Sequence, residues 1–344
     1  MRTRSRSWVK YALPLAAAAL SFAVPGVIGW LLLWGGLAAF AALVSGAAAA
    51  RFIPRRVREG VVNAAVTAAG YAAVVFIALI FIFIFKEGGA AFVHIPPREF
   101  LRTLWQPALE PPRYGVLPLV TGSVLVTVLS LLVAVPVGVG TSVYLAEIAG
   151  AREREVIKPV VELLAAVPSV VYGLLGMVIL GDVIPRLTGT PFRLNALNGG
   201  LVLAVMLTPM LASLAEDALF SVPHAYRTAS YALGATKGET IRRVLLPAAS
   251  SGVAAAVLLA LARTVGETMA VLLATGNATI LTLNPLSSVR TLTATIAIEM
   301  GETAFGSEHY HVLFALGIML FAVTFAVNLA AEVIMGRFAR RYRR

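Results

Sequence analysis

Long stretches without a charged residue dominate the pattern of hydrophobic and polar positions in this chain. A helix needs about 20 apolar residues to cross the hydrocarbon core of a membrane. The first stretch, Tyr11–Ala50, is long enough for two short spans, and Pro25 and Gly26 lie near its middle. We therefore predict a transmembrane hairpin rather than a secretory signal peptide, because the apolar region of a signal peptide has only about 7–15 residues.

Six further apolar stretches are long enough to be membrane spans. Pro136, Gly138 and Gly140 lie inside the second of them. We predict a kink or a break there, because proline removes a backbone donor and glycine bends easily. With the hairpin, the stretches predict an all-α, polytopic membrane bundle of about eight transmembrane helices. The six stretches are Val61–Phe85, Val116–Ala146, Pro159–Leu180, Gly199–Ala215, Ser250–Thr275 and Val312–Ile334.

The basic residues between these stretches predict the orientation of the helices. With the N-terminus inside, 20 of the 28 Lys and Arg residues fall in inner segments and 7 in outer segments, and the remaining one is Arg263. Basic residues concentrate on the cytoplasmic side of membrane proteins. We therefore predict a multi-pass protein of the cytoplasmic membrane with both termini in the cytoplasm.

Composition supports a membrane protein and removes other classes. Of the 344 residues, 59% are hydrophobic and 13% are charged, and the mean hydropathy is +0.87. In a soluble domain about a quarter of the residues are charged. The net charge of +11 therefore reflects cytoplasmic loops rather than a nucleic-acid partner. The absence of cysteine excludes disulfides, thiol catalysis and cysteine-ligated metals.

No nucleotide-binding motif occurs in the sequence. The phosphate-binding pattern GxxxxGK[ST] is absent, and Gly138 and Gly140 lack the third glycine of a dinucleotide fingerprint. His309 and His311 are the only histidines close enough in sequence to suggest a metal site. Their place at the end of a predicted external loop favours an ordinary interfacial role.

Two predicted external segments are longer than simple connectors. Lys86–Tyr114 contains five prolines around Trp105, and it either faces an external partner or caps the end of the bundle. Gly276–Tyr310 is apolar and rich in threonine around Leu292–Ile298. That composition predicts a re-entrant or surface helix.

Arg263 and Glu267 are the charged residues of greatest interest, because both lie well inside Ser250–Thr275. Four residues apart, they would share one face of a continuous helix. A charge at membrane depth usually faces a protein interior or a wet cavity. The two residues are either a mutually neutralising structural pair or a substrate site in which the guanidinium binds an oxyanion such as phosphate. Thr264 and Thr268, which adjoin them, belong to the same candidate pathway.

The segment 220–248 is basic and amphipathic, and its composition alone favours a helix on the membrane surface. It also resembles the EAA loop of ABC importer permeases, in which a glycine, here Gly234, is followed by Ile241 and then by Leu246-Pro247. The resemblance implies a cytoplasmic coupling helix that docks into an ATPase subunit. The family's opening glutamate is replaced here by Thr228, so this chain lacks an ionic contact from that position. The implied coupling residues are Thr228, Ala229, Gly234, Ala235, Thr236, Ile241, Leu246 and Pro247.

Longer strings, in order from about Val61 to the end, resemble the PstC-type permease of phosphate importers. The paired PstA-type permease shares the loop and the Arg-x-x-x-Glu spacing, but it typically departs after Gly-Glu-Thr, where this chain has Met269-Ala270-Val271. The strings are Tyr114–Thr127, Val167–Gly176, Leu207–Leu219, Ala232–Ala248, Ala262–Asn277 and Arg290–Glu302.

This resemblance implies a MetI-like helical core that moves inorganic phosphate across the cytoplasmic membrane. The implied partners are a PstA-type second permease, two PstB-type ATPase subunits and an external PstS-type phosphate-binding protein. The chain itself is then a transporter subunit and not an enzyme. It is expected to hold no cofactor, because ATP and magnesium bind to the ATPase subunits.

These features divide the chain into consecutive regions. Residues 1–58 form a basic tail and the transmembrane hairpin, and residues 59–115 form the first core helix and the external proline-rich loop. Residues 116–336 form the permease core, which contains the loop 220–248. Residues 337–344 form a basic cytoplasmic tail.

Two alternative functions remain open from the sequence. One is a PstA-type permease or a permease for another oxyanion, such as sulfate or molybdate. The other is a stand-alone channel or ion-coupled carrier, although carriers usually contain several buried acids and Glu267 is the only acid deep in a predicted span. We expect five other acids, near the inner ends of spans, to be solvated: Glu147, Glu162, Glu216, Asp217 and Glu332.

Overall fold

The computed structural model describes residues 55–342, which are mainly helical. The predicted hairpin Tyr11–Ala50 and the last two residues of the basic tail lie outside the described residues. The chain divides into two compact units, Met1–Leu79 and Ile80–Arg344. The description below concerns the second unit; helix α3, which leads into it, begins in the first unit at Arg55.

The all-α class is confirmed for the described residues, where a two-residue β1–β2 pair is the only sheet. Three short π-helical segments, η1 to η3, interrupt or extend the helices. The elements are α3 (Arg55–His94), α4 (Pro97–Phe100), β1 (Trp105–Gln106), β2 (Arg113–Tyr114), α5 (Leu117–Val143), η1 (Tyr144–Ile148), α6 (Ala151–Ala165), α7 (Ser169–Leu175), η2 (Gly176–Leu180), α8 (Gly181–Thr188), α9 (Ala196–Phe220), α10 (His224–Ala232), α11 (Lys237–Thr240), η3 (Ile241–Leu245), α12 (Leu246–Ala248), α13 (Ser250–Val265), α14 (Met269–Ala274), α15 (Leu292–Glu299) and α16 (Glu308–Tyr342).

Five helical segments in the described part of the chain are long and apolar enough to cross a membrane, and a sixth arises if one bent pair counts as a single span. Four of them agree with predicted spans, with ends moved by a few residues. The bent pair joins Lys237–Ala248 to Ser250–Val265 at an angle of 69°. The five segments are Val62–His94, Leu117–Ile148, Ser169–Thr188, Ala196–Phe220 and Glu308–Ala330.

A kink or a break was predicted near Pro136, and the break is absent, because α5 runs through this proline without interruption. The glycine two residues later has a packing role instead. A Cβ atom on Gly138 would lie 2.8 Å from Cδ2 of Leu211 on α9. The small residue at this position therefore allows the two helices to approach closely, as small residues do in membrane bundles.

The predicted span Pro159–Leu180 is placed wrongly. Its first part belongs to α6, a separate amphipathic helix, and the candidate span begins only at Ser169. Pro168 has an extended rather than a helical conformation, with a ψ of 140°. Residues before a proline also avoid the helical region, so the chain breaks at Val167-Pro168 and separates the two helices.

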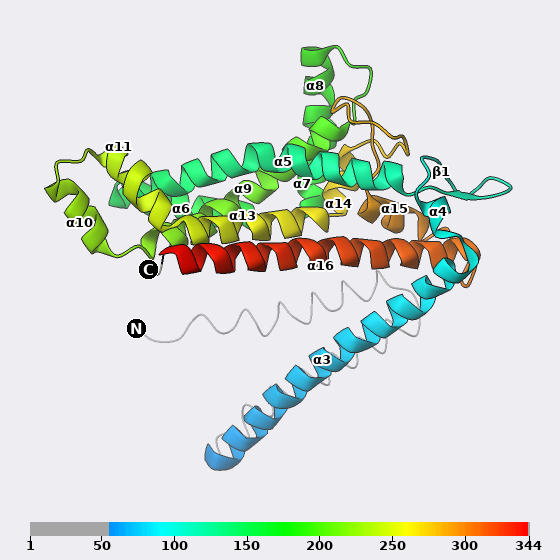
Figure 1. Ribbon diagram of the computed structural model, residues 1–344, viewed down its shortest axis with the longest axis horizontal. Helices are drawn as coiled ribbons and strands as arrows, with labels where there is room; N and C mark the ends of the chain where they lie inside the picture. The colour runs from blue at the N-terminus through cyan, green and yellow to red at the C-terminus, as the bar shows by residue number, and fades with distance from the viewer. Residues whose placement is uncertain (1–54, 343–344) are drawn as a thin grey trace, which may run out of the picture. The chain divides into compact units, whose positions relative to one another are not determined.

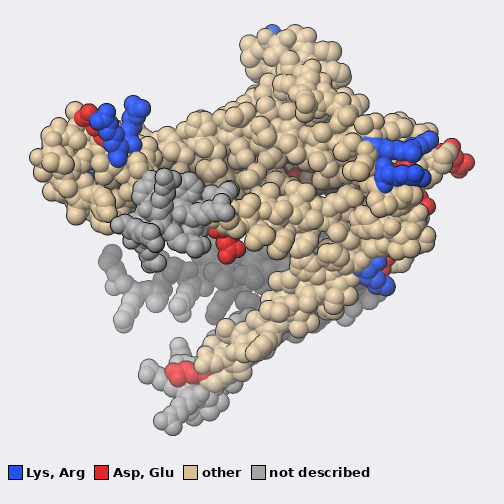
Figure 2. Space-filling view, viewed as in Figure 1, with Lys and Arg blue, Asp and Glu red and all other residues tan. Residues whose placement is uncertain are grey.

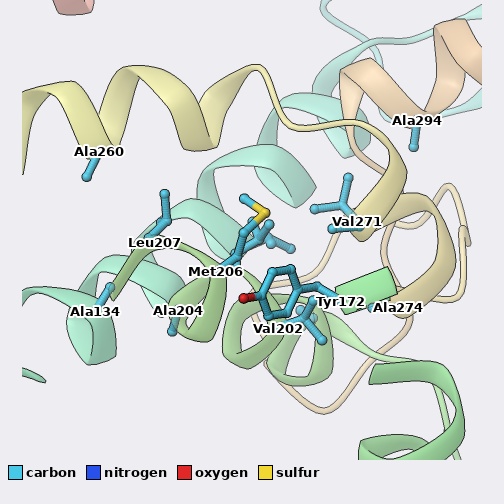
Figure 3. Close-up of a cluster of buried hydrophobic side chains, with 14 of the residues drawn as sticks. Ala134, Tyr172, Val202, Ala204, Met206, Leu207, Ala260, Val271, Ala274 and Ala294 are labelled. Carbon is cyan, nitrogen blue, oxygen red and sulfur yellow. The ribbon is translucent and has the colours of Figure 1, made fainter. Parts of the chain in front are cut away.

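Within Ile80–Arg344, the long helices α5, α9, α13 and α16 lie side by side, and α8 projects away from them (Figure 1). A cluster of buried side chains holds the central part of this bundle together, and it includes Tyr172, Val202, Met206, Leu207 and Val271 (Figure 3). The helices α10 and α11 lie at one end of the bundle, whereas α15 and the β1–β2 pair lie at the other. The bundle therefore has two structurally different ends.

Each end has its own apolar cluster. At the end with α15, Trp105 and Tyr114 pack with Leu119, Leu292 and Leu313. Since Trp105 is only 2% exposed, the proline-rich segment caps the bundle with this residue instead of presenting it to a partner. At the opposite end, buried residues of α9 and η3 form a smaller cluster: Leu219, Val222, Ile241, Leu245 and Ala249.

The glycines of α5 yield a stability prediction. A Cβ atom on Gly122 would lie 2.4 Å from the carbonyl oxygen of Arg290, whereas one on Gly140 would meet no atom within 4 Å. We expect Gly122→Ala to lower the free energy of unfolding by roughly 1–3 kcal/mol through overpacking. Gly140→Ala, the matched control in the same helix, should be neutral or stabilising. Thermal unfolding of the purified variants measures the difference, and equal midpoints would contradict the packing of the Arg290 segment on α5.

Candidate functional site

The stretch predicted as one span, Ser250–Thr275, is interrupted in its outer part. Helix α13 ends at Val265, Gly266 follows as its C-terminal cap, and α14 begins at Met269. Arg263 and Glu267 therefore do not lie on one face of a continuous helix, and this prediction is wrong. The structure also shows no ion pair between them, so the reading as a mutually neutralising pair is not supported within the described residues.

The Arg263 side chain is exposed on this chain. One guanidinium nitrogen, Nη1, lies 3.6 Å from the sulfur of Met210 on α9. No carboxylate of the described residues lies within 4.0 Å of the guanidinium. Apart from the N–H that Nη1 donates to Met210, the guanidinium hence keeps its N–H donors available for an anion or for another subunit.

Glu267 lies in the interruption between the two helices and is half-buried. Its Oε1 atom accepts hydrogen bonds from the backbone N–H groups of Thr268 (3.2 Å) and Ala270 (3.4 Å). The hydroxyl of Thr293 donates to the backbone carbonyl of Glu267 over 2.7 Å. These bonds hold the carboxylate at the start of α14 and join the interruption to α15. Thr268 donates to the carbonyl of Gly266 and lies outside the cavity described next.

A small cavity lies beside this interruption, partly open to solvent and with room for about one water molecule, and its walls carry both hydroxyl and apolar groups. Glu267 lines it together with Thr264, which is only 3% exposed. Four further hydroxyl residues line the cavity, and the sequence did not predict their place there. The threonine-rich stretch near Leu292 was the only sequence feature that pointed to any of them. Those residues come from α5 and from the start of α15: Ser123, Thr127, Thr291 and Thr293.

The predicted re-entrant or surface helix near Leu292 is present as α15, and its first turn is buried. Thr291 caps it by accepting the backbone N–H of Ala294. The N–H of Leu292 donates to the hydroxyl of Ser123 on α5 over 2.9 Å. The start of α15 is thus inserted between α5 and α14, where its hydroxyl groups reach the cavity.

The segment predicted as a coupling loop forms a helical hairpin at the end opposite α15 (Figure 1). Gly234 forms the turn between α10 and α11 with a φ of 84°, a left-handed conformation that glycine adopts without strain. Thr236 and Glu239 then make reciprocal capping bonds at the start of α11. A buried hydrogen bond of 2.8 Å between the hydroxyls of Ser230 and Thr240 ties the two helices together.

The hairpin has an exposed face and a buried face. Thr228, Ala229 and Gly234 are exposed, and so are the large side chains of Tyr231 and Leu233, the latter at 89%. On the other face, Ile241 is buried in the apolar cluster with Leu219, and Leu246 packs against its edge. Ala235 and Pro247 are half-buried. Sequence reasoning therefore found both faces of the hairpin, but it did not separate docking positions from anchoring positions.

Charged groups lie mainly at the two ends of the face shown in Figure 2, over α10–α11 and over the α4–β2 region. The band between these ends displays few charges. An apolar band flanked by charged ends is the pattern of a surface that faces lipid or another membrane subunit.

Two acids near the inner ends of spans are not solvated as predicted. The side chain of Glu147 is 7% exposed and pairs with Arg227, and that of Glu216 is 1% exposed and pairs with Arg154 and Lys158. Buried carboxylates require such partners, because desolvation of an unpaired charge is costly. Glu162, Asp217 and Glu332 are exposed, as predicted.

A second polar cluster lies at the end with α15. The carboxylate of Glu299 accepts hydrogen bonds from the Trp105 indole (3.0 Å) and Arg290 (2.7 Å), and His309 lies 2.9 Å from it. His309 thus has a structural partner, and no group of three metal-binding side chains occurs in the described part of the chain. Burial, followed by the charge of Glu308, raises the pKa of the Tyr114 hydroxyl to about 12. Tyr114 accordingly stays neutral at physiological pH.

Residues 138–344, more than half of the chain, match the model of a protein family described as binding-protein-dependent transport system inner membrane component. The chain belongs to this family. Its members are membrane permeases that work with an ATPase and an external binding protein, so the chain is a transporter subunit and not an enzyme.

Several relatives are similar over most of the chain. A probable ABC transporter permease protein, YqgH of Bacillus subtilis, is 40% identical over 71% of this chain and 79% of its own length. The phosphate transport system permease protein PstC of Mesorhizobium japonicum is 33% identical over 69% of this chain and 77% of its own. PstC 1 of Mycobacterium tuberculosis is 34% identical over 66% of this chain and 74% of its own.

Solved structures share the fold at low sequence identity. A chain of a bacterial alginate ABC transporter is 15% identical with a TM-score of 0.58, and the match covers 82% of this chain and 98% of that one. A chain of the inward-facing MetNI methionine ABC transporter is 20% identical with a TM-score of 0.50, covering 65% and 94%. The predicted MetI-like permease core is therefore confirmed as a fold.

The neighbouring residues Arg263 and Thr264 yield a prediction about access from water. The natural chain has no cysteine, so single cysteines can be labelled without background. We expect Arg263→Cys to react with a charged, water-soluble thiol reagent at least about tenfold faster than Thr264→Cys, because labelling requires an exposed thiol. Thr264 is buried and is the matched control. Equal labelling rates on the purified chain would contradict the exposure of position 263.

Proposed function

We propose that this chain is the transmembrane permease subunit of an ATP-driven importer of inorganic phosphate. The relatives named PstC, each at least 31% identical over about two thirds of this chain, support the substrate. Met269-Ala270-Val271 after Gly-Glu-Thr supports a PstC-type rather than a PstA-type subunit. The observation that carries the proposal is Arg263, an exposed basic residue inside a predicted span that directly precedes Thr264 and Val265 of the cavity wall.

Arg263 has the chemistry needed to pass an oxyanion through a membrane. A guanidinium presents a planar set of donors that matches phosphate oxygens. Its exposure on the isolated chain agrees with a position facing a second permease across a shared path. A charge at membrane depth is costly unless it faces such a path or a protein interior.

Glu267 and the hydroxyl residues would complete the local environment of the anion. The Oε1 atom of Glu267 is already bound by backbone N–H groups, and the residue is part of the cavity lining. Phosphate retains at least one proton near neutral pH, and a carboxylate accepts a hydrogen bond from a protonated oxygen. Thr264 adds a buried hydroxyl on the same wall. We assign Arg263, Thr264, Glu267 and Thr268 to the phosphate pathway.

The exposed face of the α10–α11 hairpin would dock into an ATPase subunit. Tyr231 and Leu233 are large apolar side chains that this chain leaves uncovered, beside exposed basic residues such as Lys237 and Arg242. Closure of the ATPase dimer on ATP would move this hairpin and switch the helices from inward-facing to outward-facing. Phosphate released by the external binding protein would then enter the path near Arg263.

The complete assembly would contain a PstA-type permease, two PstB-type ATPase subunits and a PstS-type phosphate-binding protein. The distribution of basic residues supports cytoplasmic termini and a cytoplasmic α10–α11 hairpin. The opposite end, with α15 and the β1–β2 pair, would then face the binding protein. About eight spans result when the predicted hairpin in residues 1–58 is counted.

Phosphate uptake by the complex reconstituted in vesicles tests the proposal. We expect ATP-dependent phosphate uptake that an excess of sulfate or molybdate does not suppress. We expect Arg263→Ala to reduce uptake by about 10- to 100-fold, the effect of losing a charge-assisted contact of about 1.5–3 kcal/mol. Arg186→Ala, at an exposed position on α8, is the matched control and should transport normally. Uptake at the normal rate by Arg263→Ala would remove Arg263 from the pathway, and uptake without ATPase subunits would favour a stand-alone channel or carrier.

Gly234 allows a separate test of the coupling hairpin. Alanine in its left-handed conformation costs about 1–2 kcal/mol, so Gly234→Ala should distort the turn and lower the amount of phosphate moved per ATP hydrolysed. Gly238→Ala is the control, because Gly238 lies in α11 and a Cβ atom there meets nothing within 4 Å. Simultaneous measurement of ATP hydrolysis and phosphate uptake gives the ratio. Unchanged coupling in Gly234→Ala would count against docking through this turn.

A further inference from the structure

Arg227 binds three parts of the bundle at once. Its Nε and Nη2 atoms donate to Oε1 of Glu147 over 3.0 and 2.6 Å. Its Nη2 and Nη1 atoms also donate to the backbone carbonyls of Leu219 (3.1 Å) and Val222 (2.8 Å). This single side chain on α10 is therefore bonded to the π-helical end of α5 and to the end of α9.

The contact is shielded from water and directional. The side chains of Arg227 and Glu147 are 12% and 7% exposed. Removing one partner of a buried ion pair leaves an uncompensated charge, which is strongly unfavourable. The apolar cluster that contains Ile241 and Leu245 of η3 also packs against Val143 and Ala146 at this end of α5, but such contacts are non-directional. The hydrogen-bonded pair is thus the contact that fixes α10 and α5 in one relative position.

Helix α5 connects this pair to the cavity. It continues from Ser123 and Thr127, which line the cavity, to η1, which contains Glu147. Twenty residues of helix span about 30 Å, so α5 is a rigid connection over most of a membrane thickness. Arg227 directly precedes Thr228, at which the exposed face of α10 begins. A displacement of the hairpin consequently reaches one end of α5, and the other end borders the cavity.

We propose that Arg227 and Glu147 are positioning residues that transmit movement of the α10–α11 hairpin to α5 and so to the cavity wall. The inference rests on the proposed function in so far as an ATPase subunit moves the hairpin. Neither residue touches the substrate. Their role is to ensure that an ATP-driven movement of the hairpin also moves the cavity wall.

A second buried ion pair at the same end provides a matched control. Arg154 on α6 pairs with Glu216 on α9 over 2.9 Å, and the Glu216 side chain is 1% exposed. Breaking this pair weakens the hold on a buried carboxylate, as breaking the Arg227 pair does, although Lys158 still lies 3.3 Å from Glu216. Within the described residues, neither Arg154 nor Glu216 forms an ion pair with α10 or α11. Arg154→Gln therefore reports the effect of lost stability alone.

The experiment follows the cavity directly in the assembled complex. Thr127→Cys, in an otherwise cysteine-free chain, is labelled by a small thiol reagent with and without ATP, and ATP hydrolysis and phosphate uptake are measured in parallel. We expect ATP to change the labelling rate of Thr127→Cys when the Arg227–Glu147 pair is intact, and also when Arg154→Gln is added. In Arg227→Gln we expect the ATPase subunits to co-purify, because Arg227 points into the bundle. The ATP effect on the labelling rate and the amount of phosphate moved per ATP should each fall about fivefold or more, which is the lower end of the range for a lost coupling.

Retention of the ATP effect and of normal transport per ATP in Arg227→Gln would overturn the inference. An equal loss in Arg154→Gln would also overturn it, because the effect would then be one of stability. If Arg227→Gln does not assemble, Glu147→Gln decides in the same way, since glutamine keeps an acceptor of similar shape without the charge. Labelling depends on ATP and not on the substrate, so an ATP response without phosphate uptake would refute phosphate transport and leave the coupling inference standing.

Discussion

The close packing of α5 against α9 is the contact on which the rest of the structure depends. In a membrane, helices gain little from hydrophobic burial against each other, so small residues that allow close approach become decisive. A Cβ atom on Gly200 of α9 would lie 2.6 Å from Cβ of Leu129, and one on Gly138 of α5 would meet Leu211. This contact between α5 and α9 holds Ser123 and Thr127 in the cavity wall at one end of α5, and it holds Glu147 next to Arg227 at the other end.

The charges of the bundle divide according to their partners. Glu147, Glu216 and Glu299 are each held by basic side chains, and the pairings of Glu147 and Glu216 join segments distant in sequence. Such pairs specify which segments meet, since a buried charge without its partner is strongly unfavourable. Arg263 differs, because no carboxylate of the described residues neutralises it. A basic group left open beside a hydroxyl-lined wall suits an anion that must bind briefly and then leave.

The two functional regions show different degrees of predictability. The hairpin 220–248 was recognised from its resemblance to the EAA loop, because Gly234, Ile241 and Leu246-Pro247 lie within one short segment. In the structure, Gly234 occupies the left-handed turn of this hairpin. The candidate pathway was recognised only in part. The unusual position of Arg263 was visible, but its relation to Glu267 was predicted from a continuous helix that ends at Val265. Hydroxyl residues from α5 and α15 complete the cavity across more than 160 positions, a separation that no spacing rule addresses.

Apolar length and charge along the chain were sufficient for the helical class and for most of the spans, because a membrane requires these properties of each segment separately. The family followed from the resemblance of short motifs, such as the one from Gly234 to Pro247. Tertiary packing decided what those segments do together. It kept α5 continuous through Pro136, divided the chain at Pro168 and Gly266, and paired Glu147 with Arg227 across 80 positions. Local sequence could not specify these outcomes, because each depends on which backbone and side-chain groups a neighbouring helix offers at the point of contact.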